Sequence, residues 1–247
     1  MHFAPRVTGI WHGAGVSALV QLRRHVTQLK GCTACPKMIG PSVAGVPVVS
    51  PVMLIGQAPG VKEGPAGKPF AWTAGKTLFQ WFATIGLTEE QFRERVYMAA
   101  VARCFPGKAE AGGDRVPDAE EIQRCGKFLV KEAQLIRPRL VIPVGKLAIL
   151  QLLPPAPEPP PTKSGRRRAA RPTLDKLVEV IGTERRVTIG GVEMDMIALP
   201  HPSGASTWHR TEPGKTLLSR ALAMIAQHEA WRSIVDGAAQ SAYSHAT

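Results

Sequence analysis

Four cysteines are the residues whose spacing most clearly suggests chemistry. Cys32 and Cys35 form a C-x2-C pair, twenty residues separate Cys104 from Cys125, and the chain has no other cysteine. Four thiolates are the usual ligands of a [4Fe–4S] cluster and of many structural zinc sites. The alternatives are a redox pair at C-x2-C or four unrelated buried thiols. The count and spacing favour a metal site, and by themselves they leave iron–sulfur and zinc open.

A second candidate is the glycine-rich stretch LIGQAPGVKEGPAGKPFAWTAGKT, residues 54–77. Its Gly-Lys-Thr end is typical of a Walker A phosphate loop, but that loop needs a glycine where Phe70 stands. An aromatic ring there would replace the bare backbone amides that bind phosphate, which disfavours a nucleotide loop. Glycines at 56 and 60 with an aromatic face at Phe70 suit a flat ring instead, because stacking on a nucleobase contributes about 1–3 kcal/mol. The alternative is that Phe70 belongs to the core.

The charge balance points to a polyanionic partner. Lys and Arg number 31 against 19 Asp and Glu, which gives a net charge of +12. Such an excess favours nucleic acid, although a merely basic protein is the alternative.

The 247 residues, 44% of them hydrophobic, suffice for one globular domain. No run is apolar enough for a membrane span or a signal peptide, so we expect a cytoplasmic protein with reduced thiols. We also expect a monomer.

The elements that must position these residues follow from apolar periodicity. It predicts helices over 16–30, 73–87, 117–138, 146–153 and 214–235. Apolar runs predict strands over 46–56, 95–104 and 140–145, and a hairpin turn at 190–191 leads into a fourth core strand ending at Leu199. We therefore expect an α/β fold, a three-layer α/β/α arrangement with a short, mostly parallel central four-stranded sheet. Ligands bind such sheets beyond the carboxyl ends of the strands.

Two segments look peripheral to a single domain over residues 1–247. Residues 154–172 hold seven prolines and a net charge of +4, from five Lys and Arg minus Glu158, and read as an extended insertion. Residues 236–247 lose the apolar pattern, and we expect them to fray. The insertion could contact DNA phosphates, or it could be a solvated linker. Its candidate DNA-binding residues are Arg166, Arg167 and Arg168.

The stretch GQAPGVKEGPAGKPFAWTAGKTL resembles the first motif of the uracil-DNA glycosylase superfamily. It is most similar to the iron–sulfur branches called family 4 and family 5, with the pattern G-E-x-P-G-x-x-E-D-x-x-G-R-P-F-x-G-x-A-G. LPHPSGAS resembles the second motif, H-P-S, and the resemblance runs from about Cys32 to Arg220. The four cysteines match the ligand positions of those branches, which implies a [4Fe–4S] cluster. The resemblance also implies a DNA glycosylase that flips and excises uracil from single- or double-stranded DNA and so initiates base excision repair.

The resemblance implies a role for each matching residue. Phe70 would stack on the extruded base, while Gln57 and the amide of Ala58 would approach the base and the sugar. His201 would donate to the base oxygen that gains charge as the glycosidic bond breaks, although a histidine beside proline is ordinarily a plain loop residue. Ser203 is expected at a phosphate, and Ser206, in the stretch GASTW, is expected in the minor groove.

The departures from the family pattern bear on the substrate. Gln57 and Ala58 replace the acidic residues that the branches place at these positions, and Gly64 replaces the Asp of the Glu-Asp pair. Glu63 is the carboxylate that remains, and it is our third catalytic candidate beside His201 and Gln57. Family 4 reads the uracil edge with an Asn where Ala100 stands, so we expect a range that can include other deaminated bases.

Two other functions stay open. The loop FPGKAEAGGDRVPD lacks the histidine of the crosslinking branch, so covalent capture of DNA is not expected. A protein that binds damaged or abasic DNA without cleaving it is the main alternative, because two acidic positions are neutral. A redox iron–sulfur protein is the third option, and the chain lacks a motif for a second cofactor.

Overall fold

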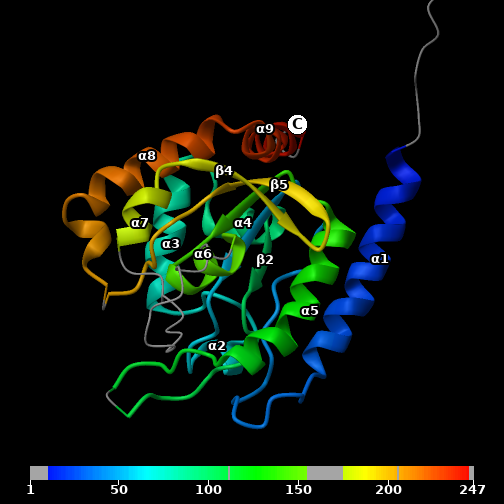
Figure 1. The fold of residues 1–247 in the computed structure, drawn as a ribbon. Coiled ribbons are helices and arrows are strands. Elements are labelled where there is room, and N and C mark those ends of the chain that lie inside the picture. The colour runs from blue at the N-terminus through cyan, green and yellow to red at the C-terminus, as the bar shows by residue number, and fades with distance from the viewer. Residues whose placement is uncertain (1–10, 111, 155–174, 205, 245–247) are drawn as a thin grey trace, which may run out of the picture.

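Helices and strands alternate along the chain in the computed structural model, which describes residues 11–110, 112–154, 175–204 and 206–244 (Figure 1). The strands are β1 (Val52–Gly56), β2 (Tyr97–Ala100), β3 (Leu140–Pro143), β4 (Glu184–Ile189) and β5 (Val192–Ile197). The helices are α1 (Trp11–Lys30), α2 (Glu63–Ala66), α3 (Thr73–Ala83), α4 (Glu89–Arg95), α5 (Ala119–Ile136), α6 (Lys146–Leu152), α7 (Asp175–Val180), α8 (Gly214–Gln227) and α9 (Glu229–Ser244), with a 3-10 turn at Trp208–Arg210. None of these helices is long and apolar enough to cross a bilayer.

The strands form one sheet in the order β2-β1-β3-β5-β4. β1 pairs in parallel with β2 and β3, and β3 pairs in parallel with β5. The expected α/β fold with a mostly parallel sheet is confirmed, but the expected number of four strands is wrong. The fifth strand is β4, the first arm of the predicted hairpin, which pairs antiparallel with β5. Only alternate residues near its end are buried, so β4 lacks the continuous apolar run that marks the core strands.

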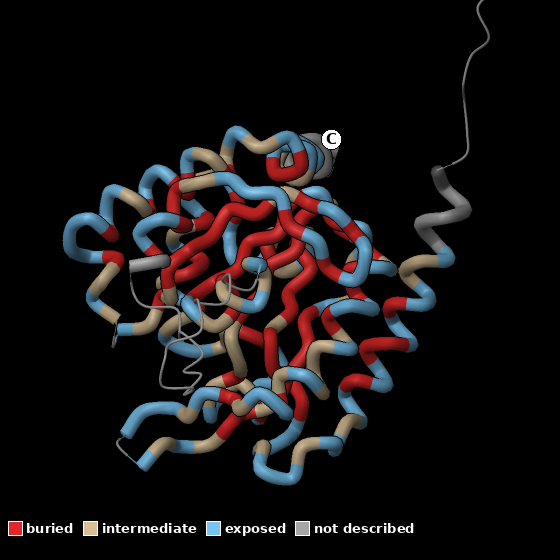
Figure 2. Tube along the Cα trace, in the orientation of Figure 1, coloured by how far each residue is buried: buried red, intermediate tan, exposed pale blue. Residues whose placement is uncertain are grey.

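The core follows the central strands (Figure 2), and every residue of β1 is buried. Three aromatic rings join the helices of one flank. Trp231 of α9 stacks on Phe82 of α3 with ring centroids 5.3 Å apart, and Phe92 of α4 lies 4.3 Å from Phe82. On the other flank α1 and α5 pack against each other, to the right of the sheet in Figure 1.

The C-terminal region differs from the expectation of one helix over 214–235. The helix ends at Gln227 and a new one starts at Glu229, because His228 has an extended backbone, with ψ at 132°. Nδ1 of His228 accepts a bond of 3.1 Å from the N–H of Ala230, and Nε2 lies 3.2 Å from a carboxylate oxygen of Asp195. A side chain that caps the next helix thus interrupts a continuous apolar pattern. Fraying of residues 236–247 stays a prediction, although α9 extends to Ser244.

A buried ion pair connects the sheet to its helices. Arg103 and Glu132 are almost completely buried, and the Arg103 guanidinium donates to Oε2 of Glu132. His25 of α1 lies 3.6 Å from the other oxygen. Burial acts to raise the pKa of Glu132, but the charge of Arg103 and the hydrogen bonds from His25, Arg103 and Tyr97 together outweigh it, so the pKa is lowered. Each of the two buried charges, on Arg103 and on Glu132, is therefore stabilised by the other.

We expect Glu132→Gln to lower the free energy of unfolding by about 3–5 kcal/mol, because it leaves a buried guanidinium without its counter-charge. Urea unfolding measures the loss. Glu120→Gln is the matched control, since Glu120 lies on the same helix in a largely exposed pair with Arg124, and it should cost less than about 1 kcal/mol. The double change Arg103→Met with Glu132→Leu should cost less than Glu132→Gln alone. Equal losses from Glu132→Gln and Glu120→Gln would contradict this.

Candidate functional site

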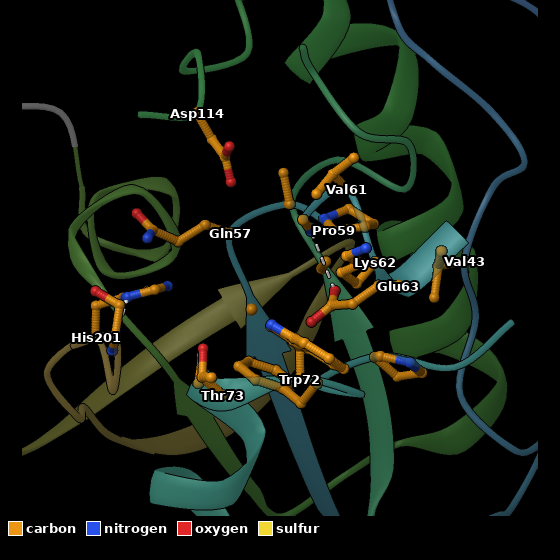
Figure 3. A pocket seen from close by; sticks show the side chains of 18 of the residues that line it. Val43, Gln57, Pro59, Val61, Lys62, Glu63, Trp72, Thr73, Asp114 and His201 are labelled. Atoms are coloured by element: carbon orange, nitrogen blue, oxygen red, sulfur yellow. Dashed lines mark hydrogen bonds between the residues drawn. The ribbon is translucent and has the colours of Figure 1, made fainter. Parts of the chain in front are cut away.

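A cavity of about 310 Å³ opens at the carboxyl edge of the sheet (Figure 3). The end of β1, the end of β2 and the loop after β5 all reach it, as parallel strands should allow. Seven of the residues singled out from the sequence line this cavity: Gln57, Ala58, Glu63, Phe70, Ala100, His201 and Ser203. Ser206 is not among the lining residues, and Arg166, Arg167 and Arg168 lie outside the described residues.

Phe70 has a backbone that side chains rarely adopt, with φ at 53°. Such a conformation costs about 1–3 kcal/mol and persists where its surroundings enforce it. Arg93 donates to the carbonyl oxygens of Pro69 at 2.9 Å and Phe70 at 3.1 Å. A β-carbon at Gly75 would overlap the Phe70 carbonyl, and one at Gly56 would lie 3.1 Å from the Phe70 ring. The two glycines and Arg93 therefore fix the ring at the base of the cavity.

Glu63 lies in the cavity wall, but its carboxyl group faces the backbone of its own loop. The N–H of Gly60 donates to it at 3.3 Å. Burial raises the pKa of Glu63 to about 7, and backbone N–H groups of Gly60, Phe70 and Ala71, with the charge of Arg93, limit that rise. Through these contacts the Glu63 carboxyl group connects the two ends of the loop and stabilises its conformation.

His201 carries its proton on a defined nitrogen. The backbone N–H of Ser203 donates to Nδ1 at 3.3 Å, so Nδ1 is an acceptor and the neutral ring keeps its hydrogen on Nε2. Burial lowers the pKa of His201, repulsion from His209 lowers it further, and Asp114 partly offsets both. A neutral imidazole with one N–H donor is therefore the form expected at neutral pH.

Gln57 lies beside His201. Its Oε1 accepts a bond of 2.9 Å from the N–H of Leu147, which leaves Nε2 as a donor. A β-carbon at Gly145 would lie 2.9 Å from Nε2 of Gln57 and 3.0 Å from Cδ2 of His201. The missing side chain of Gly145 thus lets the two polar groups converge.

Sequence reasoning missed three lining residues that bear on the chemistry of the cavity, and a glycine next to it. Trp72, 58% exposed, lies at the rim with the ammonium of Lys62 5.8 Å from its ring, and Lys108 and Asp114 come from the loop after Cys104. The glycine is Gly145, which lies against Gln57 and His201. The carboxylate of Asp114 belongs to no sequence motif of the loop. The glycine-rich stretch did contain Trp72, at a position where the family pattern has glycine, and that mismatch was the available signal.

The four cysteines form no disulfide and line a second cavity of about 250 Å³. Burial raises the pKa of Cys104 to about 11, and the nearby Cys125, Cys32 and Cys35 contribute to the rise. The thiols therefore lie close enough to repel one another as thiolates. Within the described residues no group of three or more metal-binding side chains is arranged to hold a single ion.

Comparison with known proteins gives a consistent family. Residues 44–225 match the model of the Uracil DNA glycosylase superfamily. A type-4 uracil-DNA glycosylase of Pyrobaculum aerophilum is 28% identical over 181 residues, which cover 71% of this chain and 79% of that protein. A type-4 uracil-DNA glycosylase of Archaeoglobus fulgidus is 37% identical over 97 residues, 39% of this chain and 44% of that protein. The type-5 uracil-DNA glycosylase of P. aerophilum is 27% identical over 153 residues, 50% of this chain and 65% of that protein. The chain thus spans less than half the length of the A. fulgidus relative in that alignment.

The raised pKa of Glu63 predicts a pH-dependent stability. Because the folded chain favours the protonated carboxyl, the stabilising contribution is complete below about pH 4.5 and is lost as the pH rises through about 7. We expect wild type to lose about 2 kcal/mol more than Glu63→Gln between pH 4.5 and 8, with the exposed part of the group reducing the effect. Urea unfolding at both pH values measures this, with Glu110→Gln on an exposed loop as the control. Parallel pH curves for wild type and Glu63→Gln would contradict it.

Proposed function

The match over residues 44–225 covers most of this chain, so the chain belongs to the uracil-DNA glycosylase superfamily. We propose that it hydrolyses the N-glycosidic bond of uracil in DNA, and that its fold is a three-layer α/β/α arrangement. The observation that carries the proposal is the convergence of Phe70, Gln57 and His201 on one cavity. An aromatic face, an amide donor and a neutral imidazole donor are what a flat, polar base requires. Excision of the base would start base excision repair.

The cavity suits a base that has left the duplex. The glycosidic bond is inaccessible inside the stack, so a glycosylase must extrude the nucleotide or act on a single strand. Phe70 would stack on the extruded ring, and its enforced backbone reduces the conformational entropy that the loop loses on binding. Gln57 Nε2 and the N–H groups after it would approach the base and the sugar.

His201 would stabilise the leaving group. Breaking the bond leaves its electron pair on the base, and the charge gathers on a base oxygen. A donor already oriented toward that oxygen lowers the barrier, because it needs no reorganisation during the reaction. Acceptance of the Ser203 N–H by Nδ1 supports this role, since it leaves Nε2–H to donate. Glu63 would contribute indirectly, by stabilising the loop to which its carboxyl group is bonded. This role is narrower than the catalytic role expected from the sequence.

The walls support a base range wider than uracil. Ala100 ends β2 at the cavity and offers no side-chain amide that could both donate to and accept from the base edge. Discrimination of that kind depends on polar groups that are left unpaired by the wrong base. We therefore propose that other deaminated bases also enter the cavity.

DNA would lie across the mouth of the cavity. The net charge of +12 supports binding to phosphates, and Ser203 lines the cavity at its edge. We assign Ser203 to a phosphate and Ser206, three residues on, to the minor groove. The arginines at 166–168 are proposed as further phosphate contacts, which would position the strand without reading its sequence.

Binding without cleavage is the second candidate function. It is favoured by Gln57, whose Oε1 is committed to the Leu147 N–H and which cannot accept a proton from water as a carboxylate does. It is disfavoured by His201, because a donor placed for the leaving group is of little use to a protein that only binds. The two functions differ in whether the base is released.

The four thiols fit a [4Fe–4S] cluster. All four line one cavity, and four thiolates are the usual ligands of such a cluster. When bound, the cluster would supply four iron–sulfur bonds that tie the end of α1 to the loop after β2 and to α5. A reducing cytoplasm, as the sequence predicts, would keep the thiols available.

We expect His201→Ala to lower the single-turnover rate of uracil release by about 10²–10³-fold and to change DNA affinity little, because its bond strengthens as charge develops. His201→Gln, which keeps an N–H donor, should retain part of the rate. The assay incubates uracil-containing single-stranded DNA with the protein, cleaves abasic sites with alkali and counts strand breaks on a gel. A shifted but intact strand with wild-type protein would mean that the chain binds and does not cleave.

Purified protein should be brown and contain about four irons per chain, as expected for a four-thiolate cluster. Cys125→Ala should lose most of the colour and the iron. Metal analysis and the visible absorption spectrum measure both. Colourless protein with stoichiometric zinc would overturn the cluster while leaving the glycosylase proposal in place.

A further inference from the structure

Asp114 faces the cavity from the loop between Cys104 and Cys125, and it lies near Gln57 and on the same side as His201 (Figure 3). We propose that its carboxylate stabilises the cationic sugar and takes the proton of the attacking water. This inference rests on the proposed glycosylase function and assigns it a residue outside both family motifs.

The cavity needs an anionic group, and its walls offer few. The glycosidic bond breaks toward a sugar with positive charge at C1′, which a nearby carboxylate stabilises. Gln57 and Ala58 are neutral. Among the described residues that line the cavity, the carboxylates are Glu63 and Asp114. Glu63 is engaged by backbone N–H groups, and its raised pKa leaves it largely uncharged below about pH 7. Asp114 is therefore the carboxylate free to act on the sugar.

The position of Asp114 is suited to this task. A β-carbon at Gly60 would lie 3.8 Å from its Oδ2, so the carboxylate sits over the loop on which Ala58 replaces an acid. Oδ1 forms an ion pair of 2.6 Å with Nζ of Lys108. The ion pair uses one oxygen and leaves Oδ2 to accept a hydrogen bond from water.

The loop that carries Asp114 is held in place. Residues 108 and 114 form an antiparallel bridge, and the N–H of Arg115 donates to the Gly107 oxygen at 2.9 Å. The Arg115 guanidinium makes two bonds of 2.8 Å to Glu121 at the start of α5. Arg115 thereby anchors the base of the loop beside Asp114, and the ion pair with Lys108 orients the Asp114 carboxylate.

The step balances without a further reactant. The bond between C1′ and the base nitrogen breaks, and its electron pair stays on the base, where His201 donates to the charged oxygen. The oxygen of water forms a bond to C1′, and one water proton passes to Oδ2 of Asp114. Solvent later takes that proton and protonates the base. The products are the free base and an abasic site.

The test compares Asp114→Asn with Glu110→Gln. Glu110 lies on the same loop, is exposed and does not line the cavity, so its substitution makes the same change of charge away from the site. We expect Asp114→Asn to slow single-turnover uracil release about 10²-fold or more, the range of general-base catalysis. Glu110→Gln should stay within about twofold of wild type. Affinity for DNA with a non-cleavable uracil analogue should not fall in either variant.

Chemical rescue separates catalysis from loop structure. Added formate should restore part of the rate of Asp114→Ala, because a small carboxylate can enter the space left by the side chain, and it should not affect Glu110→Gln. A rate for Asp114→Asn equal to that of Glu110→Gln would overturn the assignment. Weakened DNA binding with no rescue by formate would overturn it as well and make Asp114 structural. Wild type that binds uracil-containing DNA without releasing uracil would instead refute the proposed function itself.

Discussion

The buried pair of Arg103 and Glu132 is the interaction on which both cavities depend. Nε of Arg103 donates to the carbonyl oxygen of Ala100 at 2.8 Å, so the same side chain that meets Glu132 also supports the end of β2 at the base cavity. Arg103 precedes Cys104, lines the cysteine cavity, and its charge opposes the rise in the pKa of Cys125. One guanidinium thus links the sheet edge, the thiols and the helices, and breaking its ion pair disturbs all of them together.

The chemistry of the base cavity comes from groups that are neutral or paired. His201 is kept uncharged by burial, Glu63 is held by backbone N–H groups, and Asp114 shares its charge with Lys108. Few unpaired charges therefore face the base, although the chain as a whole carries +12. A basic surface with few unpaired charges in the cavity suits a protein that attracts a polyanion to its surface and then binds an uncharged ring in the cavity.

Sequence reasoning succeeded where the local sequence pattern of a segment is enough to predict its position in the fold. The apolar runs of β1 and β3 marked buried parallel strands, and the motifs brought Phe70 and His201 to one edge. It failed where distant segments decide the outcome. The division at His228 depends on a side chain that caps α9, while the apolar periodicity continues across it. Asp114 carries no signal of its own, since only the folding of its loop over Gly60 brings a common surface residue to the cavity.

The glycines that surround Phe70 and His201 differ in how an evolving sequence could replace them. Gly75 abuts the backbone carbonyl of Phe70, which cannot move aside without undoing the turn, whereas the nearest atoms to a β-carbon at Gly145 belong to the side chains of Gln57 and His201. Gly126 of α5 has nothing within 4 Å. A lineage could therefore change Gly126 at any time, whereas Gly145 is held both by its φ of 87° and by the close side chains of Gln57 and His201. The lineage could change Gly75 only by abandoning the turn at Phe70, so the order of accessible mutations is built into the site.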